Sequence, residues 1–210
     1  MTRYIAITDI HGEVYKLKNL ISKIEFLPDD TIVFMGDYID RGYFSKEVID
    51  YVIELGKRYN CVYLIGSHEY AYLHSRKKEE YYEYLFWNYG GDATVDSYGS
   101  YENIYKIHGD FLENLKFYYL TDKYLFVHAG INPNYSLEKQ EEEDLVYIRW
   151  NIIKSKHKLP QKVIFGHTDL DKPYIDDDKI GIDLGCGKYP DAKLCALILD
   201  NGKEEFVFSD

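Results

Sequence analysis

Cysteine, proline and long apolar runs are all scarce in this chain of 210 residues. Its three cysteines, Cys61, Cys186 and Cys195, are an odd number without CxxC spacing, which fits a reducing compartment better than a disulfide framework. No apolar run approaches the roughly 20 residues that span a bilayer. The first strand-like segment begins at once and leaves no room for a signal peptide. We therefore expect a cytoplasmic protein without a membrane partner.

Positive charge is also in deficit, because 25 Lys and Arg face 36 Asp and Glu and give a net charge of −11. Such a chain lacks the basic face that extensive nucleic-acid binding requires. A small phosphate-bearing substrate remains compatible with it, since bound metal ions can reverse the field locally. The 23 tyrosines either cover sheets and interfaces or line a substrate groove, and we favour the first interpretation.

Short apolar runs alternate with amphipathic stretches, which predicts an α/β fold in a single domain covering residues 1–210. Helices are expected at 14–24 and 45–58, and a Tyr-rich helical insert at about 69–114. Asn201-Gly202 is typical of a hairpin turn. Nothing marks a dimer interface, so we expect a monomer. Strands are expected at 4–8, 31–35, 61–65, 117–120, 124–127, 163–165, 180–183, 194–199 and 205–208.

Residues of metal-ligand type follow one predicted strand after another. A single Asp after a strand more often caps the next helix, and a single His more often has a purely structural role. Such an explanation would have to hold independently at five strand ends, so we favour a shared site. Ligand sites of open α/β sheets lie at the carboxyl ends of strands, so we expect these side chains to converge. They are Asp9 and His11 after the first strand, Asp37 and Asp40 after the second, His68 after the third, His128 after 124–127 and His167 after 163–165.

This set of side chains predicts a two-metal phosphoesterase site. Imidazoles and carboxylates are the ligands expected for Mn, Fe or Zn, and we place Mn first. A carboxylate that bridges two metals about 3.5–4 Å apart lets them activate a water for in-line phosphoryl displacement. Arg41 and Arg149 have the planar side chain that grips phosphate oxygens in pairs. For Arg149, an ion pair with the acidic run at 138–144 is the alternative interpretation.

Five motifs, taken in their order along the chain, carry a family resemblance. They are Asp9-Ile10-His11-Gly12, GDYIDRG at 36–42, GSHE at 66–69, His128-Ala129-Gly130 and Gly166-His167-Thr168. With them the chain resembles the phosphoprotein phosphatase branch of the calcineurin-like metallophosphoesterases, which includes bacterial and phage serine/threonine phosphatases and diadenosine tetraphosphate hydrolases. The resemblance extends from about residue 4 to 199. It implies a sandwich of two mixed β-sheets flanked by α-helices.

The resemblance also implies a role for each site residue. Arg41 and Arg149 would bind phosphate oxygens. His68 would protonate the leaving oxygen, and Asp40 would hold that imidazole charged and aimed. The implied metal ligands are Asp9, His11 and Asp37 at the first ion, with Asp37 bridging to a second ion held by His128, His167 and the residue at position 67.

Position 67 is where the sequence departs from the family pattern. The family motif is GNHE, whose Asn offers an amide oxygen to the second metal, whereas this chain has Ser67. Ser67 can reach the metal directly or through a water, the second metal can be lost, or the residue can be a substitution introduced to slow turnover. We expect retained binding with lowered affinity, because Asp37, His128 and His167 remain.

Three functions follow from these residues. The first is hydrolysis of phosphomonoesters in proteins, peptides or small esters; the DRG form of the second motif favours a serine/threonine phosphatase, with dual specificity open. The second is cleavage of diadenosine polyphosphates at a phosphoanhydride. The third, motivated by Ser67 alone, is a catalytically weakened phosphate-binding protein. Intact His68, Asp40 and Arg41 argue against it, since a pure binder has no use for an aimed proton donor.

Overall fold

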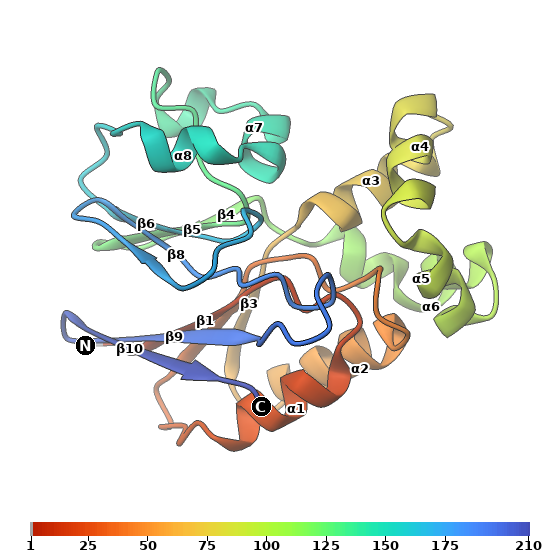
Figure 1. Cartoon of the computed structure of the whole chain (residues 1–210), viewed down its shortest axis with the longest axis horizontal. Coiled ribbons are helices and arrows are strands. Elements are labelled where there is room, and N and C mark those ends of the chain that lie inside the picture. The colour runs from red at the N-terminus through yellow and green to blue at the C-terminus, as the bar shows by residue number, and fades with distance from the viewer. Residues whose placement is uncertain (1) are drawn as a thin grey trace.

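The chain folds as a sandwich of two mixed β-sheets with helices on both outer faces (Figure 1). The structure is a computed structural model and describes residues 2–210. Within that range each sheet has five strands, in the orders β10-β9-β1-β2-β3 and β4-β5-β6-β8-β7. The predicted fold class is therefore confirmed. No helix in these residues combines the length and apolar character that crossing a bilayer demands.

The first sheet has a parallel centre and an antiparallel edge. β1 (Tyr4–Ile7), β2 (Thr31–Phe34) and β3 (Asn60–Tyr63) run parallel. β9 (Cys195–Asp200) pairs antiparallel with β1, and β10 (Lys203–Phe208) pairs antiparallel with β9. The crossovers between the parallel strands are α1 (Val14–Ser22) and α2 (Ser45–Gly56). Both Asn201 and Gly202 have positive φ, as the predicted hairpin turn between β9 and β10 requires.

The second sheet repeats this plan with shorter strands. β5 (Tyr124–Val127), β6 (Lys162–Phe165) and β8 (Lys179–Gly181) are parallel, and β4 (Tyr118–Leu120) and β7 (Tyr174–Ile175) are antiparallel edges. The short helices η1 (Leu137–Lys139), α7 (Glu142–Tyr147) and α8 (Trp150–Lys154) lie between β5 and β6. The acidic run at 138–144 is divided between η1 and α7.

Strands of both sheets are buried on two faces, which explains their continuous apolar runs. In β1, Ala6 faces the layer between the sheets, whereas Ile5 and Ile7 pack in the layer beneath α1 and α2. The side chains of β2 alternate in the same way: Val33 faces the layer between the sheets, and its two neighbours face the helices. This alternation fixes the sheets face to face, so the carboxyl ends of their parallel strands meet at one edge of the sandwich.

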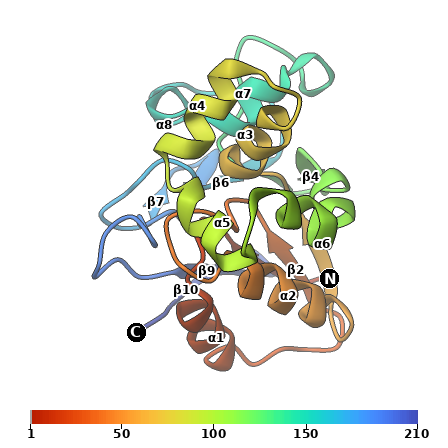
Figure 2. The same cartoon turned by 90° about the vertical axis from the view of Figure 1, so that its right-hand side faces the viewer.

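The helical insert lies at that edge (Figure 2). It comprises α3 (Ser67–Ser75), α4 (Glu80–Asn88), α5 (Gly91–Tyr98) and α6 (Tyr101–Glu113). The insert is interrupted between α4 and α5, where Gly90 has a φ of 102°. α3 begins two residues before the expected start of the insert, directly at Ser67 and His68. The insert therefore borders the strand ends that carry the candidate site.

Candidate metal centre and active site

Most of the predicted site residues lie in loops at the carboxyl ends of parallel strands. Among residues 2–210, eight residues other than glycine have positive φ, and six of these belong to the predicted site. Left-handed φ is costly for such side chains, so this concentration indicates loops shaped to aim them. The six are Asp9, His11, Asp37, Asp40, Arg41 and His167.

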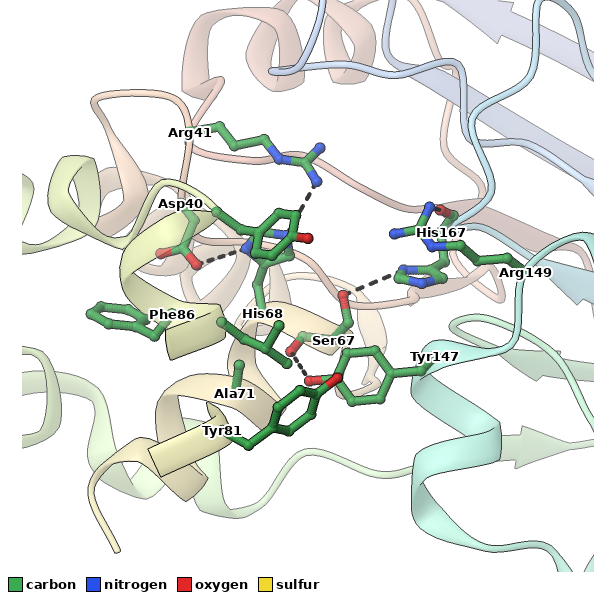
Figure 3. Close-up of a pocket in the computed structure, with 12 residues that line it drawn as sticks. Asp40, Arg41, Ser67, His68, Ala71, Tyr81, Phe86, Tyr147, Arg149 and His167 are labelled. Atoms are coloured by element: carbon green, nitrogen blue, oxygen red, sulfur yellow. Dashed lines mark hydrogen bonds and ion pairs between the residues drawn. The ribbon is translucent and has the colours of Figure 1, made fainter. Parts of the chain in front are cut away.

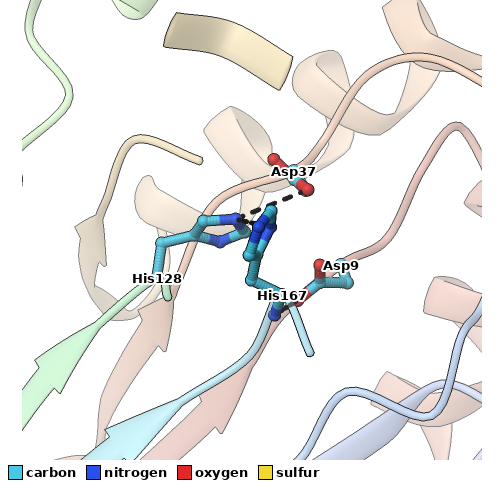
Figure 4. A group of neighbouring side chains, drawn as sticks. All are labelled: Asp9, Asp37, His128 and His167. Carbon is cyan, nitrogen blue, oxygen red and sulfur yellow. Dashed lines mark hydrogen bonds and ion pairs between the residues drawn. The ribbon is translucent and has the colours of Figure 1, made fainter. Parts of the chain in front are cut away.

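The Asp37 carboxylate is the centre of the site and faces ligand atoms from both sheets (Figure 4). Its Oδ2 lies 3.5 Å from His11 Nε2 and 3.5 Å from His128 Nε2. His128 Nε2 lies 3.2 Å from His167 Nδ1. Ligand-type atoms within 4.8 Å of one another form two groups that share Asp37: Asp9, Asp37, His128 and His167 in one, and His11, Asp37 and His68 in the other.

The two groups differ in detail from the metal sets that the resemblance implies. Asp9 groups with the two imidazoles of the second sheet, although its Oδ1 also lies 4.0 Å from His11 Nε2. His68 groups with His11 and Asp37, and its Nε2 lies 3.9 Å from Asp37 Oδ2. Asp37 holds the shared position expected of a bridging carboxylate. How the remaining side chains divide between two ions stays a prediction.

The buried imidazoles are held in the orientation that metal binding needs. His11 Nδ1 lies 2.9 Å from the Ile39 carbonyl, and His128 Nδ1 lies 2.9 Å from the Met35 carbonyl. Each carbonyl accepts an N–H there, which leaves the Nε2 lone pair pointing into the site. His11 Nε2 is buried without a hydrogen-bond partner. An orphaned nitrogen beside carboxylates is the arrangement that a divalent cation satisfies, so the residues fit a metal centre.

Burial and mutual proximity shift the pKa values of these groups. Burial acts to raise the pKa of Asp37, but four surrounding imidazoles, led by His128, lower it well below its usual value. Burial, opposed by His128, raises the pKa of Asp9 to about 6. The pKa of His11 is lowered by burial and then by Arg41. His11 is therefore neutral near pH 7, the state in which an imidazole binds a metal.

Ser67 points into the same cluster (Figure 3). Its Oγ lies 3.3 Å from Asp37 Oδ2 and 3.3 Å from His167 Nδ1. The hydroxyl therefore occupies the place that the resemblance assigns to an amide oxygen. Tyr147 donates its hydroxyl to the Ser67 carbonyl at 3.2 Å, which holds the start of α3 against α7. These contacts keep Ser67 oriented toward the cluster.

His68 and Asp40 form the predicted dyad. His68 Nδ1 lies 2.7 Å from Asp40 Oδ2, and its Nε2 lies 3.2 Å from Arg41 Nη2 (Figure 3). Burial acts to lower the pKa of His68, but Asp37 and then Asp40 raise it above the usual value. Burial raises the pKa of Asp40 itself. A buried imidazole with one nitrogen on a carboxylate and the other at an open cavity can deliver a proton there.

A cavity of about 290 Å³ opens between these groups and the insert. Arg149, between α7 and α8, lines it and donates from Nη1 to the His167 carbonyl at 3.2 Å. Within the described residues, Arg149 makes no ion pair with the acidic run at 138–144, so that alternative interpretation is wrong. Arg41 and Arg149 lie on opposite sides of the cavity mouth in Figure 3.

Two further residues support the site and had no assigned role in the sequence reading. Glu69 is fully buried and accepts backbone N–H groups of Asp37, Tyr38 and the adjacent loop residues at 2.8–3.2 Å. The Thr94 hydroxyl, from α5, donates to Asp40 Oδ1 at 2.6 Å and accepts from the Asp40 N–H at 2.8 Å. Glu69 lies within the GSHE motif, but no local signal marks Thr94.

Close approach between the two metal-binding loops explains two of the glycines. A Cβ on Gly36 would lie 2.4 Å from the Gly66 nitrogen, and one on Gly66 would lie 2.2 Å from the Asp37 nitrogen and Oδ1. Such contacts are too short for any side chain. The loop after β2 and the loop before α3 therefore touch backbone to backbone, which is what brings Asp37 beside Ser67 and His68.

Comparison with solved structures shows several phosphatases with this fold. A candidate diadenosine tetraphosphatase is 21% identical, with a TM-score of 0.71 over 99% of this chain and 94% of the other. A cold-active protein-tyrosine phosphatase of a psychrophilic Shewanella is 16% identical, with a TM-score of 0.70 over 97% and 77%. A protein serine/threonine phosphatase from Saccharomyces cerevisiae, similar to human phosphatase PP5, is 16% identical, with a TM-score of 0.70 over 100% and 80%.

These likenesses show a shared fold and leave the substrate open. The sequence itself matches the family described as calcineurin-like phosphoesterase over residues 2–209. The match includes each strand end from which the clustered carboxylates and imidazoles project. The chain therefore belongs to the calcineurin-like phosphoesterases, a family of metal-dependent hydrolases of phosphoesters.

Proposed function

We propose that this enzyme is a phosphomonoesterase that acts on phosphorylated proteins or peptides with two divalent cations. One observation carries the proposal: the Asp37 carboxylate is shared by two groups of ligand atoms beside a cavity that also presents Arg41, His68 and Arg149. A phosphoryl group needs cations around its oxygens, an attacking water and a proton for its leaving oxygen. Residues suited to each of these needs lie at or next to this cavity, which supports the proposal.

The metal ligands we propose are those expected from the sequence. Bound divalent cations, with Mn first and Fe or Zn as alternatives, supply water acidification and charge neutralisation at the phosphoryl oxygens. Ser67 offers a weaker oxygen than an amide does, so the second site has the lower affinity. The proposed ligands are Asp9, His11 and Asp37 for one ion, and Asp37, Ser67, His128 and His167 for the other.

The remaining residues bind the phosphate and move a proton. Arg41 and Arg149 face the cavity from two sides and grip the phosphoryl oxygens with planar, paired N–H donors. Burial acts to lower the pKa of His68, but Asp37 and Asp40 raise it above its usual value, and the ring delivers a proton from Nε2 to the leaving oxygen. Asp40 keeps the ring aimed through Nδ1 at 2.7 Å. His68 and the two arginines therefore act on opposite ends of the breaking P–O bond.

A second candidate is hydrolysis of a phosphoanhydride. The likeness to a candidate diadenosine tetraphosphatase over 99% of this chain supports it. The same cations and arginines would bind a polyphosphate. The protein-phosphatase form of the motif at Arg41-Gly42 and the size of the cavity favour the monoester, because a cavity of about 290 Å³ is small for a dinucleotide.

The test is to measure Mn²⁺-dependent hydrolysis of p-nitrophenyl phosphate and of diadenosine tetraphosphate by the same preparation. We expect monoester hydrolysis that EDTA abolishes and Mn²⁺ restores. Asp37→Asn should abolish it, and Asp29→Asn, an exposed acidic residue remote from the site, should retain it. Nucleotide release far faster than any monoester turnover would select the phosphoanhydride. Tight phosphate binding without hydrolysis of either compound would identify a phosphate-binding protein.

A further inference from the structure

One wall of the cavity belongs to α4 and is largely aromatic. Tyr81, Leu85 and Tyr89 recur every four residues, which places them on one face of the helix and its last turn. All three line the cavity. Tyr81 is 65% exposed and Tyr89 is 52% exposed, so their rings are available to a ligand and do not fill the core. We call these three residues the α4 wall.

The α4 wall is held in place from both ends. Phe86, the next residue after Leu85, is fully buried against Tyr72 of α3 with ring centroids 5.4 Å apart. The Tyr82 hydroxyl donates to Glu143 of α7. Just past the helix, the Gly90 carbonyl accepts the Arg41 N–H at 3.1 Å. The α4 wall therefore has a fixed position relative to Arg41, the proposed phosphate-binding residue. No new contact has to form on ligand binding to put it in place.

The position of His68 decides which part of a substrate meets this wall. The proton donor lies on the leaving-group side of the phosphoryl group, because it protonates the leaving oxygen. His68 and Ala71 lie three residues apart on the same face of α3, and both line the cavity together with the α4 wall. Ala71 has only a methyl group, so it takes up little of the cavity that α3 and α4 line. A leaving group that starts at His68 would extend across Ala71 toward α4.

We propose that the α4 wall selects aryl phosphomonoesters, with the phosphotyrosine side chain as substrate in preference to phosphoserine or phosphothreonine. The inference rests on the phosphomonoesterase function proposed above and specifies its leaving group. An aromatic ring directly on the ester oxygen lies across Ala71 against Tyr81, Leu85 and Tyr89, where offset or edge-to-face ring contacts are favourable. The short alkyl groups of serine and threonine end before they reach this surface and leave it in water.

The size and polarity of the cavity agree with this leaving group. Its volume of about 290 Å³ lies near the lower end of small-molecule sites and suits a single ring with a phosphate. Arg41, His68 and Arg149 supply polar parts of its lining, and Ala71, Leu85 and Phe86 supply apolar parts. A nucleobase of a dinucleoside polyphosphate is also flat, but a ribose and further phosphates separate it from the scissile bond.

The test compares binding and turnover across matched ligands with the Mn²⁺-loaded full chain. Binding of phenylphosphonate and of ethylphosphonate is measured by calorimetry. Neither compound can be hydrolysed, so the comparison does not depend on the different intrinsic reactivities of aryl and alkyl esters. Turnover is measured on one peptide carrying phosphotyrosine, phosphothreonine or phosphoserine. We expect phenylphosphonate to bind roughly tenfold more tightly, and Tyr81→Ser and Tyr89→Ser each to reduce the phenyl-to-ethyl ratio roughly three- to tenfold. Both variants should also lower the phosphotyrosine-to-phosphoserine ratio of kcat/KM.

Tyr84→Ser is the matched control, because Tyr84 lies on the same helix, is 60% exposed and does not line the cavity. It should keep both ratios. Equal binding of the two phosphonates would overturn the aryl preference, and so would unchanged phenyl-to-ethyl and phosphotyrosine-to-phosphoserine ratios in the Tyr81 and Tyr89 variants. If monoesters are still hydrolysed in that case, the phosphomonoesterase function itself stands. Loss of diadenosine tetraphosphate turnover in these variants, with phosphotyrosine turnover intact, would assign the wall to a nucleobase and overturn the proposal. Absence of all monoester turnover would contradict the proposed phosphomonoesterase function. The comparison of phosphonate binding would still show whether the α4 wall prefers an aryl group.

Discussion

His68 has one ring nitrogen on Asp40 and the other at the cavity, so its chemical role depends on the leaving group it faces. A phenolic leaving oxygen has a conjugate-acid pKa of about 10 and departs readily, whereas an alkoxide needs protonation. General acid catalysis therefore contributes more to an alkyl ester than to an aryl ester.

Replacement of this proton donor should separate the two ester classes. We expect His68→Asn to lower kcat on a phosphoserine peptide by about 10²- to 10⁴-fold and on p-nitrophenyl phosphate by clearly less. The measurement is single-turnover hydrolysis of both esters, with metal content determined in parallel. An equal loss on both esters with full metal content would argue against His68 as the acid.

Substitution of Ser67 tests whether the second metal site has a lowered affinity. Its hydroxyl lies 3.3 Å from Asp37 Oδ2 and from His167 Nδ1, so a longer amide side chain at this position can reach the same cluster. We expect Ser67→Asn to lower the Mn²⁺ concentration needed for half-maximal activity by about tenfold. Metal titration by calorimetry should show one weak site in the unchanged chain that becomes tight in the Ser67→Asn variant. Two equally tight sites in the unchanged chain would contradict the weakened second site.

At the scale of elements, the insert does more than border the cavity. α5 supplies Thr94, whose hydroxyl donates to Asp40 Oδ1 at 2.6 Å and also lies 2.9 Å from Ser45 Oγ. The donated hydrogen bond favours the ionised form of Asp40 against the burial that raises its pKa. α5 therefore positions the His68 dyad from 54 residues away in sequence.

Removing that hydroxyl should weaken catalysis with a recognisable pH signature. Thr94→Val keeps the shape but loses the bond, so the pKa of Asp40 rises further and the carboxylate protonates at higher pH. We expect kcat to fall about tenfold and the acidic limb of the pH–rate profile to move to higher pH. Ser97→Ala, on the same helix, is the control, because Ser97 contacts Lys46 and Glu47 and not the dyad. A uniform loss at all pH values would indicate a structural role alone.

The pattern of elements was largely predictable because each strand is a short apolar run bounded by polar or turn residues. β7, with only Tyr174 and Ile175, was not predicted, since two residues are too few to show a period. The division of the acidic run also escaped prediction. Leu145 of α7 is buried in the hydrophobic cluster of the second sheet, whereas Val146 is buried in the cluster that contains α1, α2 and the insert, and both depend on packing partners remote in sequence.

For the whole molecule, the metal centre joins the two sheets. Asp9 and Asp37 come from the first sheet, and His128 and His167 come from the second. A cation bound between them links the halves of the sandwich in the folded state only, because the unfolded chain does not bring these residues together. Metal binding should therefore contribute directly to stability.

Mn²⁺ should raise the unfolding temperature measurably. At 100 times its dissociation constant, one site adds about 2.7 kcal/mol, which corresponds to about 5–10 °C for a chain of this size. Differential scanning calorimetry with EDTA and then with excess Mn²⁺ measures this shift. Asp29→Asn should show the full rise and Asp37→Asn a much smaller one. An unchanged unfolding temperature would argue against metal binding between the sheets.

The sequence by itself determined the family, the fold class and the residues that converge at the strand ends, because these depend on local periodicity and on short motifs read in order. Tertiary structure alone decided that Thr94 supports Asp40, that Arg149 faces the cavity, and that Tyr81 and Tyr89 form its wall. These relations depend on how the insert and α7 pack against the sandwich. Such packing is a sum of many weak contacts between segments far apart in the chain, and no local pattern records it.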